Sequence, residues 1–230
     1  MSRHIVACGG GGWSSDSGAG ILEDHILGLA RAENPRVLLL PTASGDSDWL
    51  IARFHEAFSS LACRPEHLAL FRPHPGRVEE RLREQDVIYV GGGSSANLMA
   101  VWGVHGVGPM LRRAWEDGVV LAGVSAGAIC WFGRGLTNSL GRGFAAMDGL
   151  GMLPGGFCPH ADSDPGRLVT LRAMIDRGEM PPTLAVDDGA AVHVAGDGPP
   201  RLVCAQPGRT ALLVGRGGVE EPLAPAAVTV

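Results

Sequence analysis

Ser125 lies in residues 123–127 (GVSAG), which match the pattern G-x-S-x-G. An apolar run at 119–122 precedes this segment, and a helical pattern follows it. A sharp turn from strand to helix exposes a serine hydroxyl at the carboxyl edge of a sheet, where it can act as a nucleophile. The alternative is an ordinary glycine-rich turn whose serine caps the helix. We expect the nucleophile, with the Ala126 amide directed at a developing oxyanion.

A serine nucleophile needs a base, and two of the eight histidines are candidates. His160 ends a short strand-like segment and begins a polar loop, which is a suitable place for a catalytic base. His193 alternates with apolar residues inside a predicted strand, so its ring should point from one face of that strand. The other six lie in or beside predicted surface elements, or far from these motifs. We therefore expect His160 to be the base.

An acidic residue should hold the second ring nitrogen of that base. Asp187 and Asp188 directly follow the predicted strand 184–186 and so lie at a strand end. Asp162 and Asp164 are alternatives, although residues this close to His160 more often cap a turn. The group His160, Asp162 and Asp164 could also suggest a metal site, but one histidine with two aspartates is a thin ligand set. We expect no metal and no cofactor.

Two glycine runs follow predicted strands. Residues 91–96 (GGGSSA) formally satisfy the dinucleotide pattern G-x-G-x-x-A, with Glu116 and Asp117 about 20 residues later. In a dinucleotide site, however, the acidic residue follows the second strand, whereas these acids precede the strand at 119–122. We therefore expect Gly92 and Gly93 to form a backbone cradle beside Ser125 that completes an oxyanion hole. The run at 9–12 predicts a tight turn only.

The elements that must position these residues alternate between strand and helix. Continuous apolar runs bounded by glycine or proline predict strands buried on both faces, and helical spacing separates them. This alternation predicts an α/β fold: a mostly parallel sheet with helices on both faces, and antiparallel strands near the C-terminus. Strands are expected at 5–8, 37–40, 67–70, 87–90, 119–122, 184–186, 190–195, 201–204 and 211–214, and helices at 21–32, 48–61, 96–102, 107–116, 126–132 and 167–177, with a glycine-rich loop from 133 to about 151.

Composition excludes several classes of protein. All 19 basic residues are arginine, which excludes a Ser-Lys dyad, a Schiff-base lysine and a Walker P-loop. The formal charge of −5 and the lack of a basic run disfavour nucleic-acid binding, and no apolar stretch reaches the length of a membrane span. Five widely spaced cysteines without a C-x-x-C pair suggest reduced thiols in a cytoplasmic protein. We expect residues 1–230 to form one domain.

Taken together, these motifs resemble the dipeptidase E (aspartyl dipeptidase) family of serine peptidases, which is related to the cyanophycinases. The resemblance covers roughly residues 36–195, and the matching pieces are Val90-Gly91-Gly92-Gly93, Gly123-Val124-Ser125-Ala126-Gly127-Ala128, Leu153-Pro154, Pro159-His160 and Asp188-Gly189. It implies a fold like that of class I glutamine amidotransferases. It also implies a cytoplasmic enzyme that cleaves short peptides with Ser125 as nucleophile, His160 as base and Asp188 as the acid. The Asp188 carboxylate is then expected within about 3.2 Å of one His160 ring nitrogen, with Ser125 near the other.

This sequence departs from the family pattern at several positions. Ser94 follows the triple glycine where the family often has asparagine, and Ser139 stands where an acid is sometimes implicated. Arg167 falls near a family arginine that is a proposed binder of the substrate's aspartyl side chain, and its alternative role is a surface residue at a helix start. An α/β-hydrolase with Asp188 and His193 is a further alternative, but these residues are five apart on one strand. An amidase or cyanophycinase-like hydrolase, or a non-catalytic small-molecule binding domain, also remains open.

Overall fold

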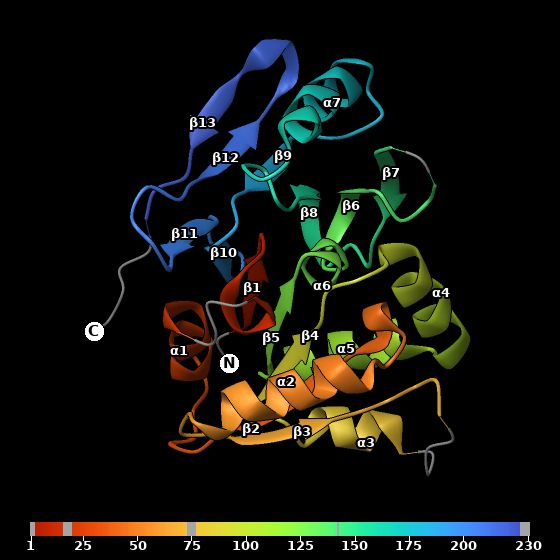
Figure 1. Cartoon of the computed structure of the whole chain (residues 1–230), viewed down its shortest axis with the longest axis vertical. Coiled ribbons are helices and arrows are strands. Elements are labelled where there is room, and N and C mark those ends of the chain that lie inside the picture. Colours follow the sequence, from red (N-terminus) through yellow and green to blue (C-terminus); the bar gives the residue numbers. More distant parts are fainter. Residues whose placement is uncertain (1–2, 16–19, 73–76, 142, 226–230) are drawn as a thin grey trace.

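The computed structural model describes residues 3–15, 20–72, 77–141 and 143–225, and its strands form two sheets (Figure 1). In the first sheet the strand order is β11-β10-β1-β5-β4-β2-β3. Strands β1 to β5 are parallel, and β10 and β11 are antiparallel to their neighbours. The strands are β1 (His4–Cys8), β2 (Arg36–Leu40), β3 (Arg64–His67), β4 (Val87–Val90), β5 (Val120–Val124), β10 (Ala190–Ala195) and β11 (Arg201–Cys204).

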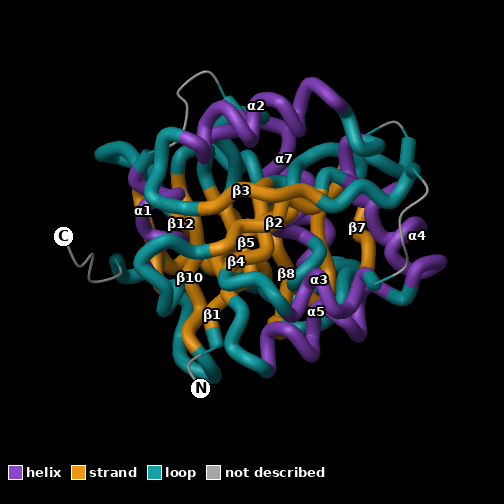
Figure 2. The backbone as a smooth tube through the Cα atoms, turned by 90° about the horizontal axis from the view of Figure 1, so that it is seen from below, coloured by secondary structure: helices purple, strands orange, loops and turns teal. Residues whose placement is uncertain are grey.

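Helices cover both faces of this first sheet. Figure 2 shows α2 on one side of the strands, with α3 and α5 on the other. Side chains of α1 and α2 share one hydrophobic cluster with the sheet, and those of α3, α4, α5 and α6 share another. The helices are α1 (Ile21–Gly28), α2 (Asp48–Ser59), α3 (Val78–Arg83), α4 (Ser95–His105), α5 (Val107–Glu116), α6 (Ala126–Ile129) and α7 (Pro165–Asp176). None of the helices within the described ranges is both long enough and apolar enough to cross a bilayer.

The second sheet has the strand order β13-β12-β9-β8-β6-β7 and packs against α7. Its central strands β6, β8 and β9 are parallel, whereas β7, β12 and β13 are antiparallel to their neighbours. The expected α/β class, with mostly parallel strands, helices on both faces and antiparallel strands near the C-terminus, is confirmed. The strands are β6 (Phe132–Thr137), β7 (Ala145–Asp148), β8 (Leu153–Cys158), β9 (Thr183–Val186), β12 (Ala211–Val214) and β13 (Glu220–Pro222).

The segment after α6 corrects one expectation. Instead of a glycine-rich loop from 133, β6 and β7 lie there, and α6 ends at Ile129. The glycines of β6 made this segment look like a loop in the sequence, yet packing requires the glycine at position 135. A Cβ at Gly135 would lie 2.3 Å from Ile129 Cγ2, so only glycine lets α6 pack this closely on the strand.

Two further differences concern the edge of the first sheet. The strand expected at 67–70 is found at Arg64–His67, where it pairs with β2 as the edge of the sheet. An edge strand tolerates polar side chains, while the buried Leu68 and Leu70 anchor the segment after the strand ends. Helix α3, a short helix with mostly charged residues, was not expected from the sequence.

The two sheets meet at the carboxyl ends of their parallel strands. An isolated parallel bridge joins Gly10, after β1, to Asp188, after β9. The Gly189 amide donates to Gly10 O at 3.0 Å, and the His160 amide, after β8, donates to Gly9 O at 3.3 Å. Because parallel strands place their following loops on one edge, this junction gathers loops from both sheets at Ser125.

Candidate active site

Ser125 forms the sharp turn between β5 and α6, with φ of 54° and ψ of −112°. A non-glycine residue in this region is strained, and the surrounding hydrogen bonds hold it there. The Ser125 amide donates to Cys8 O at 3.1 Å, and Ser125 O accepts the amides of Ala128 and Ile129 at 3.0 and 2.9 Å. The strained turn therefore belongs to the expected strand-turn-helix geometry, which projects the hydroxyl away from the backbone.

The glycines on either side of this serine are needed for space. A Cβ at Gly123 would lie 2.1 Å from Gly127 O, and a Cβ at Gly127 would lie 2.2 Å from Val90 O. Neither glycine has a positive φ. The pattern G-x-S-x-G thus reflects the close approach of β4, β5 and the start of α6, rather than left-handed backbone at the glycines.

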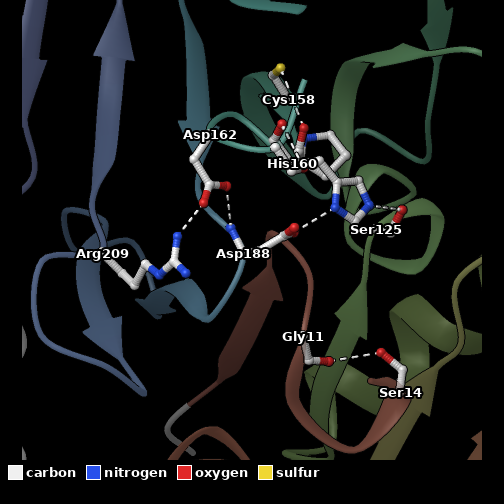
Figure 3. A network of polar contacts seen from close by, with 10 residues as sticks. Gly11, Ser14, Ser125, Cys158, His160, Asp162, Asp188 and Arg209 are labelled. Atoms are coloured by element: carbon white, nitrogen blue, oxygen red, sulfur yellow. Dashed lines mark hydrogen bonds and ion pairs between the residues drawn. The ribbon is translucent and has the colours of Figure 1, made fainter. Parts of the chain in front are cut away.

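His160 lies between Ser125 and Asp188 (Figure 3). His160 Nε2 is 2.8 Å from Ser125 Oγ, and His160 Nδ1 is 2.6 Å from Asp188 Oδ1. Both distances lie within the 3.2 Å expected for a serine, a base and an orienting acid. When Nδ1 carries the proton and donates to the carboxylate, Nε2 is free to accept the serine hydroxyl. His160 has a φ of 55°, so this residue is also held in left-handed backbone.

The acidic residues near this histidine have separate partners. Asp188 is hydrogen-bonded to His160, and this bond is the main reason that the pKa of its carboxyl is lowered. Asp187 accepts the Thr210 amide at 2.9 Å, and burial is the main cause of its raised pKa. Asp162 accepts the Asp188 amide, and Asp164 accepts the Gly166 amide as the N-cap of α7. Of the acidic candidates named from the sequence, Asp188 is the one that is hydrogen-bonded to the His160 imidazole.

Gly10 was expected only to form a turn, yet it lies against the histidine and the aspartate. A Cβ at this position would lie 1.9 Å from Asp188 Oδ1 and 2.7 Å from two ring atoms of His160. Its φ is not positive, so the requirement for glycine is purely steric. The sequence signal was present, because Gly10 lies two residues after the predicted strand 5–8, but only the fold brings the segment after β1 next to the segment after β9.

The triple glycine and the first residue of α6 lie beside Ser125. A Cβ at Gly92 would lie 3.6 Å from Ser125 Cβ, so the triple glycine borders the serine. The Gly91 and Ser94 amides donate to Leu40 O and Ala43 O, while the amides of Gly92 and Gly93 have no acceptor among the described residues. The amide of Ala126 is the first of α6 and has no acceptor within that helix.

Arg167 is buried at the start of α7, with 6% of its surface exposed. Its guanidinium lies 4.5 Å from the centre of the Phe144 ring, and within the described ranges it has no carboxylate partner. Its Nε is buried without a hydrogen-bond partner. The charge of Arg167 acts to lower the pKa of the Cys158 thiol. Burial of the thiol has the larger effect and raises that pKa to about 12. A surface role for Arg167 is therefore excluded.

His193, the second histidine candidate, lies apart from this site. His193 is hydrogen-bonded to His4 at 3.0 Å and His25 at 3.2 Å, so its ring nitrogens are not directed at Ser125. This removes the geometry that an α/β-hydrolase order would need. All five cysteines are free thiols, and within the described ranges no group of three or more His, Cys, Asp or Glu residues could hold a metal ion. His74 lies outside the described residues.

Comparison with known proteins gives a family assignment. Residues 5–200 match the model of peptidase family S51. The chain is 45% identical over 195 residues to the uncharacterized peptidase YgaJ of Bacillus subtilis, covering 85% of this chain and 84% of the relative. It is 29% identical over 199 residues to peptidase E of Streptomyces coelicolor, covering 80% and 79% of the two chains.

A solved structure shows the same fold. The crystal structure of a peptidase from an acI-B1 actinobacterium superposes with a TM-score of 0.75 and 19% identity, over 98% of this chain and 96% of the other. The fold of these peptidases is like that of class I glutamine amidotransferases, as expected from the sequence. The chain therefore belongs to peptidase family S51 and is a serine-type peptidase.

Proposed function

We propose that this peptidase cleaves short peptides through an acyl-enzyme on Ser125, with His160 as base and Asp188 as the orienting acid. The support is the hydrogen-bond chain from Ser125 Oγ through both ring nitrogens of His160 to the Asp188 carboxylate. His160 Nε2 takes the hydroxyl proton as Oγ attacks the peptide carbonyl. The imidazolium then gives that proton to the leaving amine, and water attacks the ester in the same way.

The carbonyl oxygen becomes negative in each of these steps. In the proposed mechanism the amides of Ala126 and of Gly92 or Gly93 bind this oxyanion, because Ala126 and Gly92 border Ser125 and these amides have no acceptor among the described residues. The chain works as one peptidase domain, since Ser125 follows a strand of the first sheet and His160 a strand of the second. This chemistry needs no metal or cofactor.

Arg167 is proposed to bind an acidic group of the substrate, which would favour Asp-X dipeptides. A buried guanidinium without a carboxylate partner among the described residues is costly unless a bound anion compensates its charge. Arginine suits a carboxylate through its planar, bidentate fork. An amidase or cyanophycinase-like hydrolase would use the same three side chains, so the choice of substrate separates these activities.

A panel of di- and tripeptides, assayed by the amino acids released, tests the proposal. Ser125→Ala and His160→Ala should each lower kcat by about 10⁴ to 10⁶ without loss of folding. His193→Ala is the matched histidine control and should keep most of the turnover at neutral pH, because His193 contacts other histidines. Wild-type enzyme treated with a fluorophosphonate should gain one adduct on Ser125. A folded Ser125→Ala protein with normal turnover would exclude this mechanism.

A further inference from the structure

Asp162 lies two residues after His160, and its two carboxylate oxygens have different partners (Figure 3). Oδ1 accepts a hydrogen bond from the Asp188 amide at 2.8 Å. Oδ2 pairs with the guanidinium of Arg209, which precedes β12. One side chain therefore connects the loop after β8, the loop after β9 and the turn before β12.

We propose that Asp162 is a positioning residue for the reaction: it holds the backbone of Asp188 at the distance that His160 requires, and Arg209 balances its charge. This inference rests on the proposed function of Ser125, His160 and Asp188. It adds a pair of residues that touch neither the substrate nor the reacting atoms.

Backbone hydrogen bonds hold both loops, and the Ala161 amide donates to Val186 O at 3.1 Å, but the Asp188 amide has no backbone acceptor among the described residues. The His160 amide donates to Gly9 O at 3.3 Å, and the Gly189 amide donates to Gly10 O at 3.0 Å. Each loop is thereby tied to the segment after β1. The Asp188 amide is held instead by the Asp162 carboxylate, which lies on the His160 loop itself. This bond links the two loops directly, beside the 2.6 Å contact between His160 and Asp188.

The charges at this junction also need balance. Asp162, Asp187 and Asp188 lie together, and Arg209 is the arginine that pairs with this group among the residues that the structure describes. The pKa of Asp187 is raised mainly by burial and further by its two acidic neighbours. The pKa of Asp188 is lowered mainly by its bond to His160 and to a smaller extent by Arg209. Glu23 of α1 lines the same pocket as Asp188 and Arg209, and the charges of Asp164 and Arg167 act on Cys158, two residues before His160.

Substitutions at Asp162 separate the hydrogen bond from the charge. Asp162→Asn keeps an oxygen that accepts the Asp188 amide, whereas Asp162→Ala removes it. We expect Asp162→Ala to lower kcat by about 10- to 100-fold with KM changed less than about threefold, since misplacement of a catalytic group by about 1 Å costs about 100-fold. Asp162→Asn should keep kcat within about threefold of the wild type.

The effect of removing the charge of Asp162 or of Arg209 is measured in the pH profile of kcat/KM. Arg209→Met leaves an uncompensated carboxylate near the imidazolium, so the acid limb should move up by about half a pH unit. Asp162→Asn leaves an uncompensated guanidinium and should move the limb down by a similar amount. The double variant Asp162→Asn/Arg209→Met removes both charges and should return the limb to the wild-type position.

Glu220→Gln is the matched control, because Glu220 pairs with Arg172 and lies on β13, the edge strand of the second sheet. Its side chain is 28% exposed, against 27% for Asp162, so both variants break comparable ion pairs. The control should keep the wild-type kcat and pH profile. Asp162→Ala and Asp162→Asn could instead lose kcat equally, with losses of kcat that follow their losses of Tm. That result would mean that Asp162 has a structural role only, and it would overturn the inference.

The two proposals fail in different ways. A kcat of Asp162→Ala within twofold of the wild type, while Ser125→Ala is inactive, overturns the positioning role and leaves the proposed function standing. Turnover in Ser125→Ala overturns the proposed function itself. If Asp162→Ala does not fold, the opposite shifts of the acid limb in Asp162→Asn and Arg209→Met decide the matter, and an unshifted limb in both overturns the inference.

Discussion

Gly10→Ala should inactivate the enzyme by adding a single methyl group beside the proposed triad. The new Cβ would lie 1.9 Å from Asp188 Oδ1, whereas such contacts in proteins are essentially never shorter than 3.0 Å. Oδ1 must therefore move by at least about 1.1 Å (3.0 − 1.9), and the His160 ring, at 2.7 Å from the same Cβ, must move as well. Because Oδ1 is the atom bonded to His160 Nδ1 at 2.6 Å, this movement breaks the bond that orients the imidazole.

Two reference values bracket the expected loss of kcat. Misplacing a catalytic group by about 1 Å costs about 100-fold, and losing the function of a triad aspartate costs about 10⁴-fold. We expect kcat to fall by about 10² to 10⁴, which corresponds to about 2.7 to 5.4 kcal/mol in activation free energy. The backbone at Gly10 has no positive φ, so alanine itself introduces no backbone strain.

The assay is release of amino acids from the best dipeptide substrate, with the Tm measured in parallel. Gly28→Ala is the control, because a Cβ at Gly28 meets no atom within 4 Å and should leave kcat unchanged. In an Asp188→Ala background, Gly10→Ala should cost much less than it does alone, since the clashing oxygen is gone. Wild-type kcat in Gly10→Ala, or losses that add fully in the double variant, would refute this reasoning.

Three further predictions concern residues whose partners the structure defines. Asp188→Asn should lower kcat by about 10⁴-fold, whereas Asp187→Asn should cost less than about tenfold, because its amide oxygen still accepts the Thr210 amide; a reversed order in kcat would show that Asp187 is the acid. Arg167→Ala should lower kcat/KM for Asp-X dipeptides by about 10- to 150-fold, with partial recovery in Arg167→Lys, and an equal loss on neutral dipeptides would mean a packing role. The pKa of His193 is lowered to about 4, first by burial and then by His25 and His4, from 6.5 in the unfolded chain. The unfolded state therefore takes up a proton first, so stability is intact above about pH 6.5 and falls between there and about pH 4. For this half-buried ring the loss is about 1 to 2 kcal/mol, or about 2 to 8 °C in Tm. Between pH 7.5 and 5 the Tm of His193→Gln should thus fall less than that of the wild type, and parallel curves would count against this origin.

The proposed nucleophile and most of the first sheet were predictable because their signals are local. An apolar run bounded by glycine or proline, such as β2 or β4, is buried on both faces, and burial of that kind appears directly in the residue types. The strand-turn-helix around Ser125 is equally local, since five residues determine it. The position of His160 after a strand-like segment was also visible, although its distance from Ser125 was not.

The second sheet was harder to predict, because its strands are short and contain glycines. Gly135 looks like a loop residue until α6 is seen to pack against it, and β3 is polar because it is an edge strand. In both segments the composition reflects packing or position in the sheet, which residue type alone does not record. Propensity alone therefore predicts a loop in place of β6, and it places β3 three residues too far along the chain.

Local sequence patterns predict the class of fold, the turn at Ser125 and the residue types from which the proposed site is built. Which of those residues meet depends on the tertiary structure, because they meet where loops from two sheets converge. It brought Asp188 rather than Asp187 to His160, and it joined Asp162 to the Asp188 amide. It also buried Arg167, which sequence reasoning could equally have left on the surface. Hydrogen bonds and close contacts of this kind depend on distances between residues far apart in the chain, and no local pattern records such distances.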